Sequence, residues 1–226
     1  SGSPATRIRY EIGRLRFLKG DYSGALQVLP DQSDELGKAR IAESHYMTSI
    51  AESILRRPGW QDRARAHADE AVLANSSAAR YIRQDCLAHI QNAGADVKSG
   101  ASLNRCPIDD TPEKFLLRGM YFLKQAQLID ISAYDAASVD HWRSVLRLAE
   151  DSFRSGREAY ANAAAGKRQV RFDDLARDID VGLALDQGLK VIGRCRRDIT
   201  IAEDSPAWEE LSAFFGHYGV LKCSSR

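Results

Sequence analysis

Apolar residues recur at three- and four-residue intervals along most of the chain, which is the spacing of one face of an α-helix. In residues 5–19, Ile8, Ile12, Leu15 and Leu18 fall on one side of such a helix. The same pattern predicts further helices over about 34–57, 60–75, 77–91, 111–131, 136–164 and 172–197, and a last one from Ser205-Pro206. No segment alternates with a period of two, so we expect an all-α protein without a sheet.

The stretch Ile12–Leu29 has the composition of two helices that meet at a tight turn. Gly20 is placed to end the first helix, and Asp21 or Ser23 can cap the second. Gly13 and Ala25 are small enough to let the two helices touch. We expect the larger apolar residues of the stretch to fill the space between and beneath the helices: Ile12, Leu15, Phe17, Leu18, Leu26 and Leu29. One hairpin cannot bury its apolar faces alone, so further helices should stack on it.

The chain is expected to divide near its middle. Residues 93–110 carry little apolar periodicity and are rich in glycine and serine, so they predict a linker between two domains or a long loop within one. Thr111-Pro112 then marks a strong helix start. Residues 5–92 would form stacked helical hairpins and 111–221 a bundle packed on them. Residues 1–4 resemble a cloning remnant.

The composition of the chain argues against nucleic-acid binding and membrane association. The 226 residues carry a net charge of +1, so no global field draws the protein to nucleic acid. No run approaches the roughly 18 apolar residues of a membrane span, so no membrane association is expected. The four cysteines form no CxxC pair. They could form two disulfides, but reduced thiols in a cytoplasmic protein are the expectation.

A search for catalytic or metal-binding patterns is negative. None of the five histidines has a second histidine or a cysteine at ligand spacing. The chain contains neither a phosphate-binding GxxxxGK[ST] loop nor a GxSxG nucleophile turn. Its adjacent carboxylates, such as Asp109-Asp110, stand at predicted helix starts, where the helix dipole favours them. We therefore expect no enzyme activity, no cofactor and no metal.

Two segments resemble tetratricopeptide repeats (TPR), the 34-residue helical hairpins that stack into a right-handed superhelix, or α-solenoid. The first carries Ile12-Gly13, Phe17, Gly20-Asp21-Tyr22, Ala25 and Leu29 in the order of that family, and the second Met47, Ile50-Ala51, Ile54, Trp60, Ala64, Ala68 and Ala71. Arg16, Pro30 and the uneven repeat spacing depart from the family pattern. The resemblance covers Arg7 to about Ala74, roughly a third of the chain.

The resemblance implies a concave surface that binds a protein or peptide. The side chains on it would be Arg7, Tyr10, Arg14, Phe17, His45, Thr48 and Glu52. Some of them, Tyr10 and Phe17 above all, could instead pack against the next repeat. Arginines beside aromatic residues suit an acidic peptide or a terminal carboxylate. Tyr10 and Arg14 replace the lysine and asparagine of the family's heat-shock carboxylate clamp, so that ligand is not expected. The predicted function is a non-catalytic scaffold, such as the sensing or assembly domain of a larger regulator.

Three alternatives remain open at this point. Basic residues around 167–171 and 190–197 could bind nucleic acid, although acidic residues are interleaved with them. The helix over 115–131 is apolar nearly all round and could cover a small-ligand pocket. The aromatic last helix, with Trp208, Phe214, Phe215 and Tyr218, could also mediate self-association.

Overall fold

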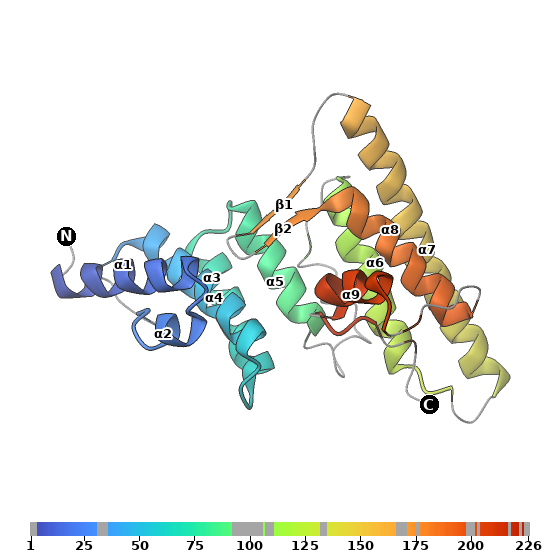
Figure 1. Cartoon of the computed structure of the whole chain (residues 1–226), viewed down its shortest axis with the longest axis horizontal. Coiled ribbons are helices and arrows are strands. Elements are labelled where there is room, and N and C mark those ends of the chain that lie inside the picture. The colour runs from blue at the N-terminus through green and yellow to red at the C-terminus, as the bar shows by residue number, and fades with distance from the viewer. Residues whose placement is uncertain are drawn as a thin grey trace. The chain divides into compact units, whose positions relative to one another are not determined.

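The computed structural model describes residues 4–30, 36–91, 106, 111–131, 135–165, 171–174, 177–197, 202, 204–216, 218–221 and 223. The chain forms two compact units (Figure 1). The first comprises residues 1–92 with 173–177, and the second comprises 93–172 with 178–226. Each unit is built almost entirely from helices, which agrees with the predicted fold class.

The first unit opens with the expected hairpin of α1 (Pro4–Leu18) and α2 (Tyr22–Leu26). Gly20 takes a φ of 80°, a left-handed conformation that costs glycine little, and so turns the chain. The Asp21 carboxylate caps α2 by accepting a hydrogen bond from the Gly24 amide at 2.9 Å. The Phe17 ring meets Tyr22 edge to face across the turn, with 5.3 Å between centroids.

Three longer helices complete this unit: α3 (Lys38–Leu55), α4 (Trp60–Ala74) and α5 (Ala79–Gln91). Helix α3 packs against both α4 and α5. The buried Ser49 hydroxyl joins all three, because it donates to the Ala64 carbonyl at 2.7 Å and accepts from Gln84 Nε2 at 3.0 Å. The helix expected from Asp34 begins at Lys38 instead, and Asp34 itself lies outside the described residues.

The second unit is built on α6 (Pro112–Leu128), α7 (Ala136–Ala165) and α8 (Val181–Arg196), which lie alongside one another in Figure 1. The fully buried Phe153 ring of α7 lies against Gly119 of α6 and Gly188 of α8. A Cβ atom at either glycine would overlap the ring. The missing side chains therefore let three helices close around one aromatic residue.

A short β-hairpin replaces the first part of a predicted helix. Strands β1 (Arg171–Asp174) and β2 (Arg177–Asp180) pair with each other, so the expectations of no sheet and of a helix over 172–197 are wrong. Helix α8 begins only at Val181, because the extended Asp180 caps it by accepting a hydrogen bond from the Leu183 amide at 3.0 Å.

The C-terminal segment is tied to the bundle by a covalent bond. Helix α9 (Pro206–Leu211) begins where Ser205-Pro206 predicted it, and a π-helical turn follows at Ser212–Gly216. Cys195, at the end of α8, forms a disulfide with Cys223. Trp142 Nε1 of α7 donates to the Cys223 carbonyl at 3.1 Å. These contacts fix the end of the described chain against α7 and α8.

All four cysteines are disulfide-bonded, so the expectation of reduced thiols is wrong. The Cα atoms of Cys195 and Cys223 lie 4.9 Å apart, within the usual range for a disulfide. A cytoplasmic location stays a prediction, and the oxidised cysteines count against it because disulfides persist mainly in oxidising compartments. In the described parts of the chain, no helix has both the length and the apolar composition that a bilayer crossing requires.

Removing the Cys195–Cys223 cross-link should destabilise the second unit. The disulfide closes a loop of 28 residues, and loss of a cross-link that closes a loop of this length costs about 3.6 kcal/mol in unfolding free energy. We expect Cys195→Ala/Cys223→Ala to lower the urea midpoint accordingly, with wild-type protein under reducing conditions as a parallel measurement. Thiol-reactive reagent added to the unreduced, denatured chain should label no cysteine, and labelling of any cysteine would contradict the described pairing.

Candidate functional site

Helix α1 buries the face that carries its aromatic residues. Tyr10 and Phe17 are 3% and 2% exposed, with the buried Gly13 between them. A Cβ atom on Gly13 would lie 2.7 Å from the Leu29 side chain, so glycine is what allows this close approach. Their burial therefore favours the alternative that Tyr10 and Phe17 pack within the fold over a place on a recognition surface. Both are core residues that hold α1 against the rest of the first unit.

A polar contact inside this interface fixes the orientation of α1. The Tyr10 hydroxyl donates to Glu43 Oε2 of α3 at 2.9 Å. Burial and this hydrogen bond to a carboxylate raise the pKa of Tyr10 well above its ordinary value, so the phenol keeps its proton. Glu43 also lies 3.6 Å from Arg14 and 4.0 Å from Arg80 of α5. One carboxylate thus connects α1, α3 and α5.

The predicted recognition residues on α3 are buried as well. His45, Thr48 and Glu52 are 7%, 5% and 5% exposed. The His45 and His67 Nδ1 atoms lie 2.9 Å apart across α3 and α4, and the Glu52 carboxylate receives two hydrogen bonds from Arg63, at 2.8 and 2.9 Å. The contacts of His45 and Glu52 join α3 to α4, and the burial of all three side chains counts against a role for them in ligand contact.

The outer face of α1 carries a row of exposed aliphatic side chains, which we call the α1 row. It consists of Ile8, Ile12, Leu15 and Leu18, exposed by 58%, 40%, 54% and 48%. These residues recur at helical spacing and form one apolar stripe. The expectation that Ile12, Leu15 and Leu18 fill the space between helices is therefore wrong. An exposed cluster of this kind is typical of an interaction surface.

Arginines lie along both edges of the α1 row. By helical phase, Arg7 and Arg14 follow one edge and Arg9 and Arg16 follow the other. Arg14 pairs with Glu43, and Arg16 donates to the Gly24 carbonyl at 3.0 Å. Arg7 and Arg9 are exposed and form no ion pair with any described residue. Of the predicted recognition residues, only Arg7 and Arg14 thus remain on the surface.

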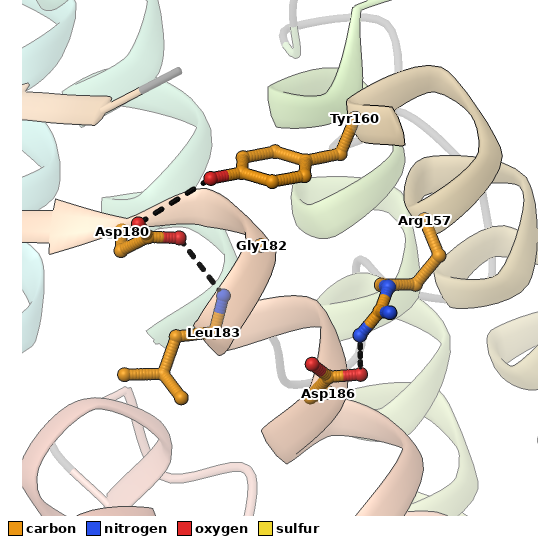
Figure 2. A pocket seen from close by; sticks show the side chains of 6 residues that line it. All are labelled: Arg157, Tyr160, Asp180, Gly182, Leu183 and Asp186. Carbon is orange, nitrogen blue, oxygen red and sulfur yellow. Dashed lines mark hydrogen bonds and ion pairs between the residues drawn. The ribbon is translucent and has the colours of Figure 1, made fainter. Parts of the chain in front are cut away.

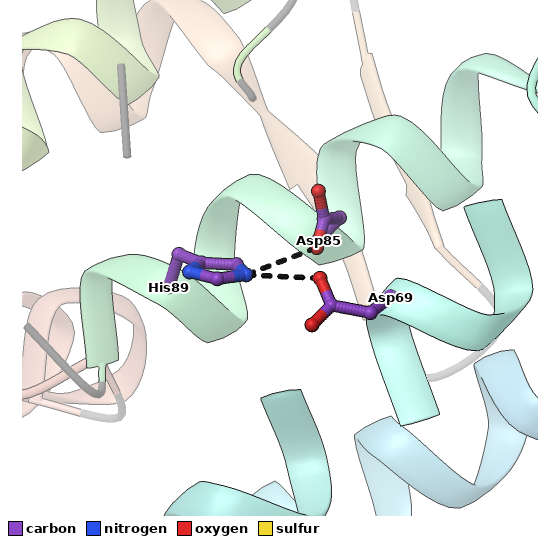
Figure 3. A group of neighbouring side chains, drawn as sticks. All are labelled: Asp69, Asp85 and His89. Carbon is purple, nitrogen blue, oxygen red and sulfur yellow. Dashed lines mark hydrogen bonds and ion pairs between the residues drawn. The ribbon is translucent and has the colours of Figure 1, made fainter. Parts of the chain in front are cut away.

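Three ionisable side chains converge between α4 and α5 (Figure 3). His89 Nε2 lies 3.1 Å from Asp69 Oδ1 and 3.4 Å from Asp85 Oδ1. Asp85 and His89 stand four residues apart on one face of α5, and Asp69 approaches them from α4. The ligand atoms of the three lie within 4.8 Å of one another, so these residues could hold a metal ion. The sequence search missed the group because it sought histidine or cysteine partners.

The electrostatics of this group favour a proton at its centre. Burial lowers the pKa of His89, but its contacts with Asp69 and Asp85 outweigh that effect and raise the pKa overall. Burial also raises the pKa of Asp85, against the opposing influence of His89. A metal would have to displace the proton on His89 Nε2. In the geometry present, the imidazole of His89 between the carboxyl groups of Asp69 and Asp85 acts as a clasp between α4 and α5.

The second unit has an open hollow of about 320 Å³ between α7 and the start of α8 (Figure 2). Arg157 forms an ion pair with Asp186, and the Tyr160 hydroxyl donates a long 3.4 Å hydrogen bond to Asp180 Oδ2. Gly182 and Leu183 complete the lining. The polar side chains in this hollow contact one another rather than converging on a shared point. A small ligand would therefore have to break existing pairs to bind.

The hollow also lies in a different place from the pocket considered in the sequence analysis, which was expected under residues 115–131. Its lining comes from α7, β2 and α8. The apolar side chains Leu116, Leu117, Met120 and Leu123 of α6 are buried in the core. Among the described residues, the α1 row is the surface feature that packing within the fold explains least.

Comparison of the chain with protein-family models, with curated proteins and with solved structures found no match. The residues and their geometry are accordingly the basis for the functional proposal.

Substitution of one residue on each face of α1 tests which face is buried in the core and which is exposed to solvent. Phe17→Ala should lower the unfolding free energy by about 3–5 kcal/mol, because it leaves a cavity in a closely packed core. Arg7→Ala should change it by less than about 0.5 kcal/mol, because the side chain is exposed and forms no ion pair with a described residue. Urea unfolding of the two variants measures both values. Similar effects in the two variants would contradict the orientation of α1.

The clasp between α4 and α5 should make stability depend on pH. The raised pKa of His89 means that its stabilising effect is fully present below the ordinary histidine value of about 6.5 and is lost as the pH rises through the folded-state pKa. The raised pKa of Asp85 acts in the same direction, because its stabilising effect is likewise lost as the pH rises through its folded-state pKa. We therefore expect the unfolding free energy contributed by the clasp to be smaller at pH 8 than at pH 6.

The comparison of Asp69→Asn with wild type isolates this effect from other titrating groups, including the His45–His67 pair. The stability difference between the two proteins should shrink between pH 6 and pH 8. Asp62→Asn is the matched control, because Asp62 lies on the same helix, is exposed and forms an ion pair with Arg65, which is not part of the clasp. An Asp69→Asn effect that is constant with pH, or equal to that of Asp62→Asn, would contradict the protonated clasp.

Proposed function

We propose that this chain is a non-catalytic protein-binding module and that its first unit is a TPR-like stack of helical hairpins. The α1 row carries the proposal. Four aliphatic side chains, each at least 40% exposed, lie on one face of a helix that is otherwise well packed. Their exposure to water is unfavourable, and a partner that covers them would recover that free energy on binding.

The construction of the first hairpin supports a TPR-like arrangement. Gly20 turns the chain, Phe17 and Tyr22 pack across the turn, and Ala25 is completely buried. Helices α3 and α4 follow as a second hairpin, with Ala64, Ala68 and Ala71 buried along the return helix. In stacked repeats, each hairpin uses its neighbours to cover its apolar faces. The α1 row is then a face of such a stack that no described element covers.

The proposed binding surface differs from the concave face that the resemblance implied. On α3 the predicted residues are buried, and His45 and Glu52 contact α4, while on α1 the aromatic residues lie in the core. Arg7 keeps its role because it borders the α1 row. Recognition would therefore use the outer side of the first helix, with aliphatic contacts at the centre and arginines at the edges.

Photo-cross-linking from defined positions tests this function. We expect a photoreactive phenylalanine analogue at position 15, in the centre of the α1 row, to form adducts with a protein in an extract of the source cells. The same analogue at position 73 is the matched control, because Leu73 is 77% exposed on α4 but stands alone. Adducts from position 15 that survive nuclease treatment and are absent from position 73 would support the proposal.

Three results of that experiment would count against a protein-binding module. Adducts with nucleic acid alone would favour the nucleic-acid alternative. Equal protein labelling from positions 15 and 73 would mean that the α1 row has no special role. No adduct at either position, in extracts prepared under both oxidising and reducing conditions, would remove the α1 row as a binding surface.

A further inference from the structure

We propose that the α1 row binds an acidic amphipathic helix of a partner protein, one that presents aliphatic residues at three- and four-residue intervals with carboxylates on both sides. The inference rests on the proposed function and specifies its ligand. It follows from the spacing of the apolar residues, from the charges beside them and from the poor fit of the other possible occupants.

The spacing of the α1 row matches the packing surface of another helix. Ile8, Ile12 and Leu15 follow the i, i+4, i+7 pattern, and Leu18 extends it by one more turn. At a rise of 1.5 Å per residue, the row is about 15 Å long, or close to three helical turns. Ridges formed by such side chains fit into the grooves of a second helix. Helix α1 packs on α2 and α3 with its opposite face, so this face is available.

The charges beside the row select an acidic partner. Arg7, Arg9, Arg14 and Arg16 lie along its two edges, against one acidic residue on the helix, Glu11. Arg7 and Arg9 form no ion pair with a described residue, so they are available to carboxylates of a partner. Arginine binds carboxylates through two parallel hydrogen bonds. Placed at the edge of an apolar contact, these pairs would give specificity and faster association.

A second copy of this chain fits the row poorly. Pairing two α1 helices through their rows would bring the arginines of one copy close to those of the other, with only Glu11 in each copy to offset the repulsion. The apolar residues alone favour self-association, but the charges oppose it. An acidic partner with an apolar face would cover the apolar residues and also pair with the arginines.

An anionic lipid surface also fits less well than a helix. Helices that lie in a membrane interface commonly use tryptophan or phenylalanine on the apolar face, whereas the aromatic residues of α1 are directed into the core. Glu11 stands three residues after Ile8 and four before Leu15, so its carboxylate lies on the face that would enter the lipid. A protein helix can place a basic residue opposite this carboxylate, whereas an anionic lipid surface cannot.

Binding of designed peptides to the full-length chain tests the proposal. The probe is an 18-residue labelled helix with leucines at the spacing of the α1 row and glutamates along both edges. Two matched peptides serve as controls: one has lysine in place of every glutamate, and the other has the acidic composition in scrambled order. Fluorescence anisotropy should show binding of the acidic helix, at least tenfold weaker binding of both controls, and an affinity for the acidic helix that falls as salt is added.

Variants of the chain assign the binding to the row and to its edges. Leu15→Glu should weaken binding of the acidic helix by at least about tenfold, because it places a charge at the centre of the contact. Leu73→Glu, at an exposed leucine outside the row, should leave it unchanged. Arg7→Glu/Arg9→Glu should weaken binding more than Arg143→Glu/Arg147→Glu, which makes the same change of charge on α7. Circular dichroism confirms that each variant remains folded.

Several results would overturn the proposal. Equal binding of the lysine peptide would remove the selection by charge. In one such result, the chain sediments with phosphatidylserine vesicles, loses this property in Leu15→Glu, and fails to bind the acidic helix. That combination would show that the row binds lipid. If the chain forms a dimer and Leu15→Glu dissociates it, the α1 row binds a second copy of the chain. If position 15 cross-links to a protein but the acidic helix does not bind, the proposed function stands and the ligand class is wrong. If position 15 does not cross-link to a protein and the acidic helix does not bind, the proposed function and the proposed ligand class are both wrong.

Discussion

The burial of Tyr10 and Phe17 around Gly13 determines what the first unit presents to solvent. A helix packed on one side of a small unit can bury only one of its faces, and α1 buries the one with the larger aromatic side chains. Gly13 makes this possible because Leu29 occupies the space that any other side chain would fill. The aliphatic face of the same helix is consequently directed outward. The proposed binding surface is thus a direct result of how the core is packed.

The helical ends could be predicted well where the sequence carries a local capping signal. Thr111 accepts a hydrogen bond from the Lys114 amide, and Ser205 accepts one from the Trp208 amide, as the two Pro-containing helix starts indicated. Such signals need only neighbouring residues. The β-hairpin was missed because Phe172 and Ile179 also fit a helical period, and nothing local showed that Asp180 would act as a cap.

The candidate surface was harder to predict, for a physical reason. The periodicity of α1 shows two apolar faces, one aliphatic and one aromatic, but the choice between them depends on Leu29, Glu43 and other residues of later elements. The resemblance to a repeat family assigned Tyr10 and Phe17 to a ligand, whereas tertiary packing assigned them to the core. The group of Asp69, Asp85 and His89 likewise needs two helices to bring its members together, so sequence spacing reveals only the Asp85–His89 part.

The oxidised state of all four cysteines couples the folding of this chain to electron transfer. Each disulfide forms only when two electrons pass to an acceptor, so the native state depends on the redox surroundings as well as on the sequence. A chain synthesised where thiols are kept reduced would fold without the bond between Cys195 and Cys223, and its C-terminal segment would be held by noncovalent contacts such as that of Trp142. The choice of expression compartment therefore decides which form of the protein is obtained.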